Sequence, residues 1–169
     1  MWSWPEKMLQ RRDVIGEDVV YQAIWSDDSL RWVAVSADSR CRVLDAVSGN
    51  ALLIFEDHSR PVLGVAWVGA GGRVVSVGVD QTMRMWDTAT GRTERTLDNH
   101  LKAIQGVISL PTDRSSHPVV ATFGDDQTVR LWQPTIGRMM RFIKLTSNPK
   151  CAVISQADKQ IHVGCEDGH

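Results

Sequence analysis

Two stretches of the chain repeat one pattern and decide its fold: VVSVGVDQTMRMWDTATG (Val74–Gly91) and VVATFGDDQTVRLWQPTIG (Val119–Gly137). In each stretch an Asp stands six residues before a Trp, and a Gly follows that Trp by five residues. Strand-like units that repeat at a period of about forty residues are typical of solenoids and propellers. Such folds usually present binding surfaces rather than house a reaction.

The turn Asp marks four units along the chain: Asp38, Asp80, Asp126 and Asp167, which are spaced by 42, 46 and 41 residues. A polar insertion, Pro111–Pro118, explains the longer middle interval and is predicted to be a surface loop. The predicted repeat units cover residues 15–56, 57–98, 99–145 and 146–169, and residues 1–14 complete the last of them.

The segments between these turns predict short strands and almost no helix. Stretches such as VLGVAWV and TVRLWQP are rich in β-branched or large apolar residues and end at Asp, Gly, Ser, Asn or Pro. Several of them are nearly continuous apolar runs, which indicates sheets that are covered on both faces. We therefore expect an all-β fold of about four blade-equivalents.

Composition narrows the classes of partner and the compartment. The 19 basic and 20 acidic residues are interspersed and leave a net charge of −1, which argues against nucleic acid and anionic membranes as partners. No apolar run reaches the roughly 18 residues of a membrane span, and the N-terminus lacks the pattern of a signal peptide. Cys41, Cys151 and Cys165 are expected to be buried free thiols, which favours the cytoplasm.

These motifs resemble the WD-repeat β-propeller family, most strongly over Glu56–Arg138. The resemblance implies blades of four antiparallel strands, lettered a to d from the axis outward. It also implies a hydrogen-bonded set of four side chains, with a His between strands d and a, a Ser or Thr on strand b, the turn Asp, and a Trp on strand c. The two sets in this chain are His58, Ser76, Asp80 and Trp86, and His100, Thr122, Asp126 and Trp132.

The first and last units keep the turn Asp but lack the other members of the set. Different residues stand at those positions: Ala34, Leu44 and Glu17 or Asp18 in the first unit, and Val163 and Asn148 or Pro149 in the last. A buried carboxylate is costly unless it is hydrogen-bonded. We therefore expect these two blades to rely on apolar packing and backbone ladders alone, and to be softer than the others.

The ionisable residues form no catalytic or metal-binding pattern. His58 and His100 are assigned to the structural sets, and no His-x-x-x-His or Cys-x-x-Cys spacing is present. No nucleophile-elbow motif is present, and the GAGG stretch at residues 69–72 reads as a tight turn rather than a phosphate loop. The sequence predicts no catalytic residue, no metal, no cofactor and no enzyme activity.

The predicted function is a non-catalytic scaffold for protein–protein interaction. The resemblance implies that partners dock on the face that carries the d–a and b–c turns. The candidate binding residues there are Arg40, Arg60, Leu63, Gln81, Lys102, Gln105, Asp125 and Gln127. The alternative is a targeting or regulatory propeller fragment of a larger enzyme or signalling protein.

The two ends of the sequence suggest how the ring is completed. Residues 1–14 read as strands c and d, whereas the last unit stops after strands a and b. If the last residue were joined to the first, Trp4 would fall six residues after Asp167, as in the two complete sets. We therefore expect either a partial ring or half of an eight-bladed ring, formed as a homodimer that shares blades.

Four further Trp residues are expected to pack between blades: Trp2, Trp25, Trp32 and Trp67. An indole combines a large apolar surface with one polar N–H group, so exposed Trp residues are frequent anchors at interfaces. Exposure of any of the four would therefore indicate a docking surface.

Overall fold

The computed structural model describes residues 15–16, 18–69, 72–111, 117–155, 157 and 159–169. The all-β prediction is confirmed, because every element in these residues is a strand except one 3-10 helix, η1 (Pro134–Ile136). The strands form three four-stranded antiparallel sheets and one two-stranded sheet. Sequence neighbours pair in every sheet, so each sheet is a simple meander.

We call the sheets blades 1 to 3 and half-blade 4. Blade 1 contains β1 (Val20–Trp25), β2 (Arg31–Ser36), β3 (Cys41–Asp45) and β4 (Ala51–Phe55). Blade 2 contains β5 (Val62–Val68), β6 (Arg73–Gly78), β7 (Met83–Asp87) and β8 (Arg92–Leu97). Blade 3 contains β9 (Ile104–Ser109), β10 (Val120–Gly124), β11 (Thr128–Gln133) and β12 (Arg138–Lys144). Half-blade 4 contains β13 (Pro149–Ile154) and β14 (Ile161–Cys165).

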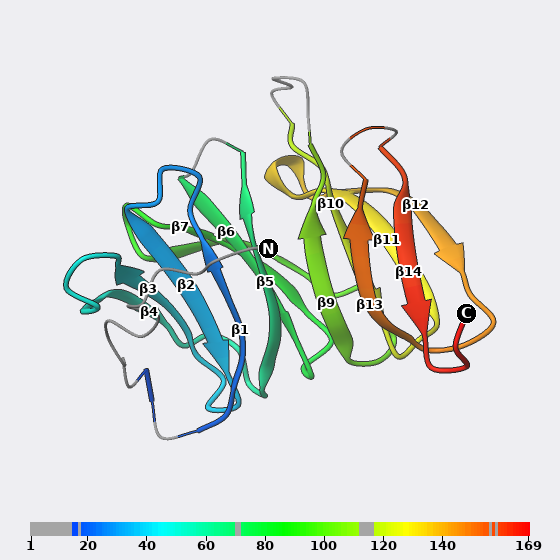
Figure 1. Cartoon of the computed structure of the whole chain (residues 1–169), viewed down its shortest axis with the longest axis horizontal. Coiled ribbons are helices and arrows are strands. Elements are labelled where there is room, and N and C mark those ends of the chain that lie inside the picture. Colours follow the sequence, from blue (N-terminus) through cyan, green and yellow to red (C-terminus); the bar gives the residue numbers. More distant parts are fainter. Residues whose placement is uncertain (1–14, 17, 70–71, 112–116, 156, 158) are drawn as a thin grey trace, which may run out of the picture.

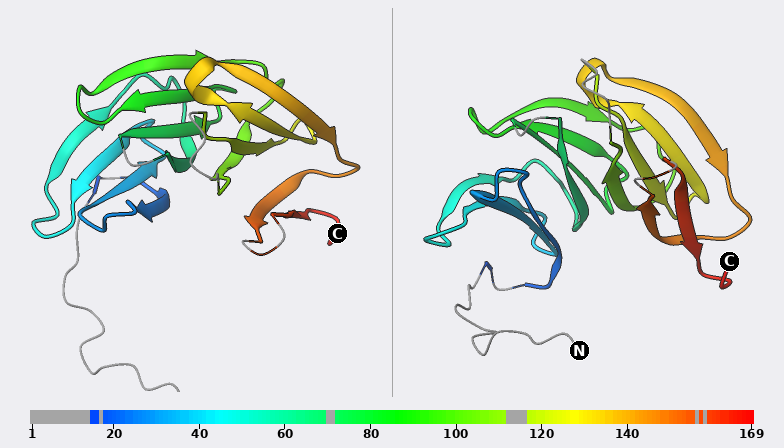
Figure 2. Two further views of the ribbon diagram at one scale, coloured as in Figure 1. Left: turned by 90° about the horizontal axis from the view of Figure 1, so that it is seen from above. Right: turned by 45° about the horizontal axis from the view of Figure 1, so that its top comes forward.

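The blades stand side by side in an open arc (Figure 1). Seen from above, the first strands of the blades lie on the inner side of the arc and β4, β8 and β12 on its outer side (Figure 2). Residues of β1, β5, β9 and β13 line a groove of about 410 Å³ on the inner side. The arc does not close, and blade 1 and half-blade 4 both lie toward its open side (Figure 2).

The core lies between the blades, because neighbouring sheets bury the faces that they turn toward each other. Blade 1 packs against blade 2 through Val33, Val43 and Trp86, among others. A second cluster joins blades 2 and 3, and a third joins blade 3 to half-blade 4. Burial on both faces explains the continuous apolar runs of the inner strands, since neither face has to be polar.

Three details differ from the sequence-based expectations. Trp25 was expected to pack between blades, but it is 61% exposed. Strand β8 has the sequence RTERTL, and it carries no apolar signal because it is the exposed outermost strand of its blade. The expectation of three buried thiols was wrong for Cys151, which is exposed, and for Cys165, which is half-buried, whereas Cys41 is fully buried. The predicted strands in residues 1–14 lie outside the described residues, as does most of the insertion Pro111–Pro118.

Backbones approach most closely where blades 2 and 3 converge toward the inner side. A Cβ atom on Gly64 of β5 would stand only 2.9 Å from Gly106 Cα of β9. Backbone atoms of a packed sheet cannot move aside as a flexible side chain can. The third residue of β5 is therefore restricted to Gly, and at Gly106 a Cβ atom would collide with the Phe123 ring.

Gly64→Ala is expected to lower the free energy of unfolding by about 1–3 kcal/mol, because the added methyl group overpacks this contact. Urea denaturation followed by Trp fluorescence measures the change. Gly72→Ala is the matched control, because nothing lies within 4 Å of a Cβ atom built there. An equal loss in the two variants would contradict the close-approach explanation.

Candidate functional site

In blade 2, four side chains from three different places in the chain form one continuous relay of hydrogen bonds. The indole Nε1–H of Trp86 donates to Ser76 Oγ at 2.7 Å. The Ser76 hydroxyl lies 2.7 Å from His58 Nε2, and His58 Nδ1 lies 2.8 Å from Asp80 Oδ2. The side chains of His58 and Asp80 are 1% and 4% exposed, so the relay is almost fully enclosed.

Blade 3 repeats the relay with Thr in place of Ser. Trp132 Nε1–H donates to Thr122 Oγ1 at 2.9 Å, and Thr122 Oγ1 lies 2.7 Å from His100 Nε2. His100 Nδ1 in turn lies 2.9 Å from Asp126 Oδ2. The structure thus brings together all eight side chains of the two sets that the sequence analysis singled out.

The direction of the relay follows from the charge state of the His. Burial lowers the pKa of His100 below its usual value, although Asp126 acts in the opposite direction. A neutral His100 donates through Nδ1–H to the Asp126 carboxylate and accepts at Nε2 from the Thr122 hydroxyl. Each hydrogen bond of the relay then joins one donor to one acceptor, from the Trp132 N–H at one end to the Asp126 carboxylate at the other.

The carboxylates of these sets also hold the neighbouring turns. Asp126 Oδ2 accepts the backbone N–H of Leu101 at 3.1 Å, and Asp126 Oδ1 accepts the backbone N–H of Thr128 at 3.2 Å. Asp80 holds Ser59 and Thr82 in the same way at 3.3 and 3.1 Å. Each carboxylate therefore ties a d–a turn to a b–c turn.

The same two turns meet in every blade through one backbone hydrogen bond. The residue at the start of each b–c turn donates to a carbonyl just before or at the start of strand a: Ala37 to Val19, Val79 to Pro61, Asp125 to Ala103, and Glu166 to Asn148. These connections form one face of the arc, which we call the turn face. It consists of the d–a and b–c connections of the four blades.

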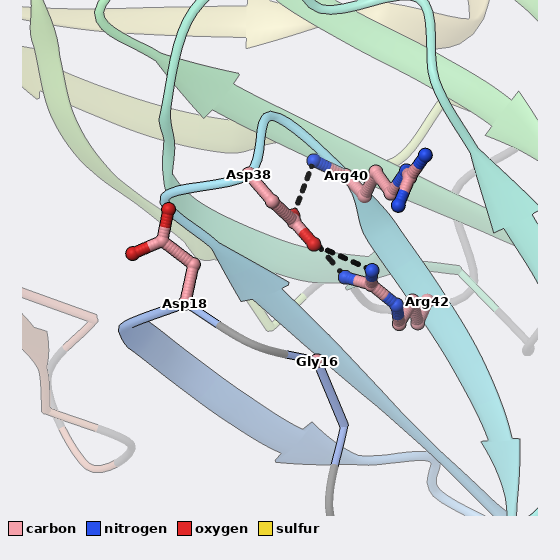
Figure 3. Close-up of a pocket in the computed structure, with 5 residues that line it drawn as sticks. All are labelled: Gly16, Asp18, Asp38, Arg40 and Arg42. Atoms are coloured by element: carbon pink, nitrogen blue, oxygen red, sulfur yellow. Dashed lines mark hydrogen bonds and ion pairs between the residues drawn. The ribbon is translucent and has the colours of Figure 1, made fainter.

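Blade 1 satisfies its turn Asp in another way, so the expectation that it relies on apolar packing and backbone ladders alone was wrong. Arg42 of β3 forms an ion pair with Asp38 (Figure 3). It also donates to Ser36 Oγ at 3.1 Å. Ser36 Oγ also donates to Asp38. The position of the missing His is occupied by Gly16, which stands 22 residues before Asp38, as His58 stands 22 before Asp80. A Cβ atom on Gly16 would lie 3.3 Å from Asp38 Oδ2.

Half-blade 4 has no such network among the described residues. Asp167 is exposed and accepts the backbone N–H of His169 at 3.3 Å. Asn148, near the expected His position, bonds instead to Glu166 at 3.1 Å. For this blade the expectation of packing without a buried polar set agrees with the geometry.

The candidate binding residues have different environments on and beside the turn face. Arg60, Gln81 and Lys102 are exposed, whereas Leu63 and Gln127 are half-buried. Arg40 is exposed and forms an ion pair with Glu56 at 2.7 Å. Gln105 donates to Asp125 at 2.8 Å, so these two side chains brace each other.

Sequence reasoning missed two features of this face. Leu101 directly follows the His of blade 3, and its side chain is 78% exposed. In blades 1 to 3 an Arg also stands four residues after the turn Asp: Arg42, Arg84 and Arg130. Arg130 Nη2 lies 3.0 Å from Asp126 Oδ2, whereas Arg84 Nε lies 4.0 Å from Asp80 Oδ2. The repeated Asp-x-x-x-Arg spacing was the available signal for the network of blade 1.

The described part of the chain offers little for chemistry. Within it, no three His, Cys, Asp or Glu side chains gather as metal ligands would. A cavity of about 640 Å³ is lined by Gly16, Asp18, Asp38, Arg40 and Arg42. Within it, Arg42 forms an ion pair with Asp38 (Figure 3), and Arg40 forms an ion pair with Glu56 outside it. Among the described residues, no helix has the length and apolar character that crossing a membrane would need.

Comparison with known proteins agrees with this geometry. Residues 49–87 and 91–133 each match the family described as WD domain, G-beta repeat. Over 80 residues the chain is 34% identical to Protein Notchless of Drosophila melanogaster. The matched segment covers 47% of this chain and 16% of that protein. It is 31% identical over 111 residues to an uncharacterized WD repeat-containing protein of Synechocystis sp., covering 59% of this chain and 31% of that protein.

A third relative is the chromatin assembly factor 1 subunit FAS2 homolog of Oryza sativa subsp. japonica. It is 37% identical over 62 residues, which is 37% of this chain and 12% of that protein. The matches therefore span less than a third of the length of each of these three relatives.

Asp38→Ala is expected to cost about as much stability as Asp80→Ala, on the order of 1–3 kcal/mol each. Each change leaves a buried polar side chain without its partner, Arg42 in the first case and His58 in the second. Denaturant unfolding of both variants measures this. Arg42→Leu combined with Asp38→Ala should recover part of the loss, since the double variant leaves no unpaired guanidinium. A double variant whose loss of stability equals or exceeds the sum of the losses in Asp38→Ala and Arg42→Leu would refute the coupling.

Acid should destabilise the protein through its turn carboxylates. Burial alone would raise the pKa of Asp80, but hydrogen bonds from His58 and Thr82 outweigh it and lower the pKa to about 2. Hydrogen bonds from Arg42 and Ser36 likewise outweigh burial at Asp38 and lower its pKa to about 2. Since both values lie below the ordinary value, this stability is complete above about pH 4 and is lost as the pH falls toward 2.

The expected observation is a free energy of unfolding that declines over that acidic range in the wild type. The decline should be shallower in Asp80→Asn, which cannot titrate. Urea titrations at a series of pH values provide the measurement. An Asp80→Asn variant with the same pH dependence as the wild type would show that this carboxylate does not carry the effect.

Proposed function

Because this chain is built from WD repeats of the β-propeller family, we propose that it is a non-catalytic scaffold that binds other proteins through its turn face. The observation that carries the proposal is the pair of buried relays. Asp80 and Asp126 fix the backbone of the turns beside them, so the exposed side chains of those turns are held in place before a partner arrives. Pre-ordered loops lose less conformational entropy on binding.

The chemistry of the turn face supports a protein partner. Leu101 offers an apolar anchor, and Lys102 beside it is exposed. Gln81 and Gln127 hold left-handed backbone conformations with φ of 68° and 59°, which places a polar side chain at a position where Gly is favoured. An apolar centre within a polar rim is the usual composition of a protein–protein interface. The partner proposed here offers an apolar side chain to Leu101 and a carboxylate to Lys102.

The alternative of a targeting or regulatory propeller in a larger enzyme is less well supported. None of the relatives described above carries the name of an enzyme. Their names include a chromatin assembly factor subunit and Notchless. A scaffold role is the function that the relatives and the turn face support together.

Two finer points belong to the same proposal. We propose that a second copy of the chain is among its partners. We also propose that the protein works in a reducing compartment, the cytoplasm, since Cys41, Cys151 and Cys165 are all free thiols. Cell fractionation with an antibody to the protein tests the compartment, and recovery in an oxidising compartment would overturn that point.

The binding proposal is tested with a double variant, Leu101→Ser with Lys102→Glu, used as bait beside the wild type. Quantitative mass spectrometry of the captured proteins should show that specific partners fall by about tenfold or more, as expected for removal of an interface anchor. The backbone bond from Leu101 to Asp126 is unaffected by this change, so the fold should persist.

Val47→Ser is the matched control, because Val47 is 85% exposed in the c–d turn of blade 1, outside the turn face. It should retain the partners at wild-type levels. Partners that survive the double variant but are lost in Val47→Ser would place the binding surface elsewhere and overturn the proposal.

A further inference from the structure

Trp25 and Trp67 hold equivalent positions in successive blades but have opposite environments. Trp67 of β5 pairs with Val74 of β6, and Trp25 of β1 pairs in the same register with Trp32 of β2. Trp67 is 7% exposed, whereas Trp25 is 61% exposed. The difference arises because blade 1 covers the face of blade 2 on which Trp67 lies, whereas Trp25 lies on the outer face of blade 1.

The contact between blades 1 and 2 shows how such a face is normally covered. The face of blade 1 that bears Val33 and Val35 packs against Trp67, Val74 and Trp86 of blade 2. At its rim, the Arg31 guanidinium lies 5.4 Å from the Trp67 ring centroid and 3.3 Å from Thr88 Oγ1. The covering face thus contributes small or β-branched side chains against a large indole.

The corresponding face of blade 1 is open at both margins. On the inner margin, Trp25 and Trp32 lie beside each other with ring centroids 6.5 Å apart. On the outer margin, Leu52 and Ile54 of β4 are 51% and 49% exposed. The centre of the face is already buried, including Leu44. The exposed apolar margins are the part of this face that a partner would cover.

The other end of the arc offers a second uncovered sheet face with small side chains. Ala152 and Val163 of half-blade 4 face blade 3, so Val153 and His162 point to the opposite side. Val153 is 62% exposed. Gly164 lies in the same face and is so close to Cys151 that an added Cβ atom would stand 2.8 Å from its Sγ atom. Strand β14 pairs only with β13 among the described strands, which leaves one edge unpaired.

We propose that a second copy of the chain docks end to end, with the Val153 face of its half-blade 4 against the exposed apolar margins of the outer face of blade 1. The large indoles of Trp25 and Trp32 meet a face that contains Gly164 and Val153, which matches large groups with small ones as a packed interface requires. The two ends lie toward the same open side of the arc (Figure 2), so a second arc can cap both at once. The assembly is then a closed dimer with two identical contacts related by a two-fold axis.

The competing arrangement pairs the outer face of blade 1 with the same face of another copy. It would bring large side chains against large ones and would leave the Val153 face of half-blade 4 uncovered. The end-to-end contact covers both ends of the arc and is therefore the arrangement that the structure favours.

This inference names one partner of the proposed scaffold but uses surfaces outside the turn face. The two proposals can therefore fail separately. The Leu101→Ser, Lys102→Glu double variant must keep the dimer even where it loses other partners. Loss of other partners in that variant says nothing against the dimer.

The test measures the mass of the full chain by light scattering and sedimentation over a concentration series. The wild type is expected at 2 × 18.8 kDa. Trp25→Glu and Val153→Glu each damage both symmetry-related contacts, so each should raise the dimer dissociation constant at least about tenfold. Both residues are exposed in the single chain, so circular dichroism and urea melts should show that the variants fold. Val47→Ser is the control and should keep the wild-type mass.

Mixing the two variants gives the deciding result. In a mixed dimer one contact carries both substitutions and the other carries neither, so the mixture should associate more tightly than either variant alone. A wild type that stays at 18.8 kDa, or that grows into open assemblies, overturns the proposal. Disruption by Trp25→Glu but not by Val153→Glu, with no recovery on mixing, would also overturn it and would favour pairing of two blade 1 faces.

Discussion

The buried carboxylate of the b–c turn is the constraint on which the architecture of the turn face depends. An enclosed carboxylate is tolerated only when its oxygens are fully hydrogen-bonded. In blade 3 a His of the d–a connection and a Thr beside the b–c turn supply these hydrogen bonds. Asp126 meets it by accepting from His100, from Thr128 and from the backbone of Leu101. The relay behind His100 then fixes the strand that carries Trp132. One charged group thereby orders two turns and two strands of its blade.

Blade 1 shows that the requirement matters more than the residue that meets it. His, Ser and Trp are all replaced there, yet Asp38 is paired with Arg42 and bonded to Ser36. The two arrangements differ chemically. The positively charged Arg42 neutralises Asp38 in blade 1, whereas a neutral His100 connects Asp126 to Thr122 by hydrogen bonds in blade 3. The change lies on the outer face of the arc, which no neighbouring blade among the described residues covers. Gly16 at the place of the missing His leaves room for the Arg42 guanidinium beside Asp38.

Each blade has two apolar faces and therefore needs neighbours for its stability. Among the described strands, only the blades in the interior of the arc have a neighbouring sheet on both faces. Blades 2 and 3 are covered on both sides, which accounts for the complete burial of Trp86 and Trp132. The inner strands come so close that Gly64 and Gly106 leave no space for a methyl group. The same geometry that makes the interior tight leaves apolar surface at both ends. The proposed binding at the ends and the proposed binding at the turn face thus use separate surfaces of one architecture.

Much of this was determined by the sequence alone. The Asp-to-Trp spacing predicted the repeat, and the offsets of His58 and His100 identified both relays, because a hydrogen-bonded set at fixed register leaves a fixed spacing. Other features had no local signal. Strand β8 is polar and is defined only by its pairing with β7, and the role of Arg42 depends on the space that Gly16 leaves open. The exposure of Trp25 against the burial of Trp67 was decided by the tertiary structure, because burial depends on which sheet stands next to a residue and not on the residue itself.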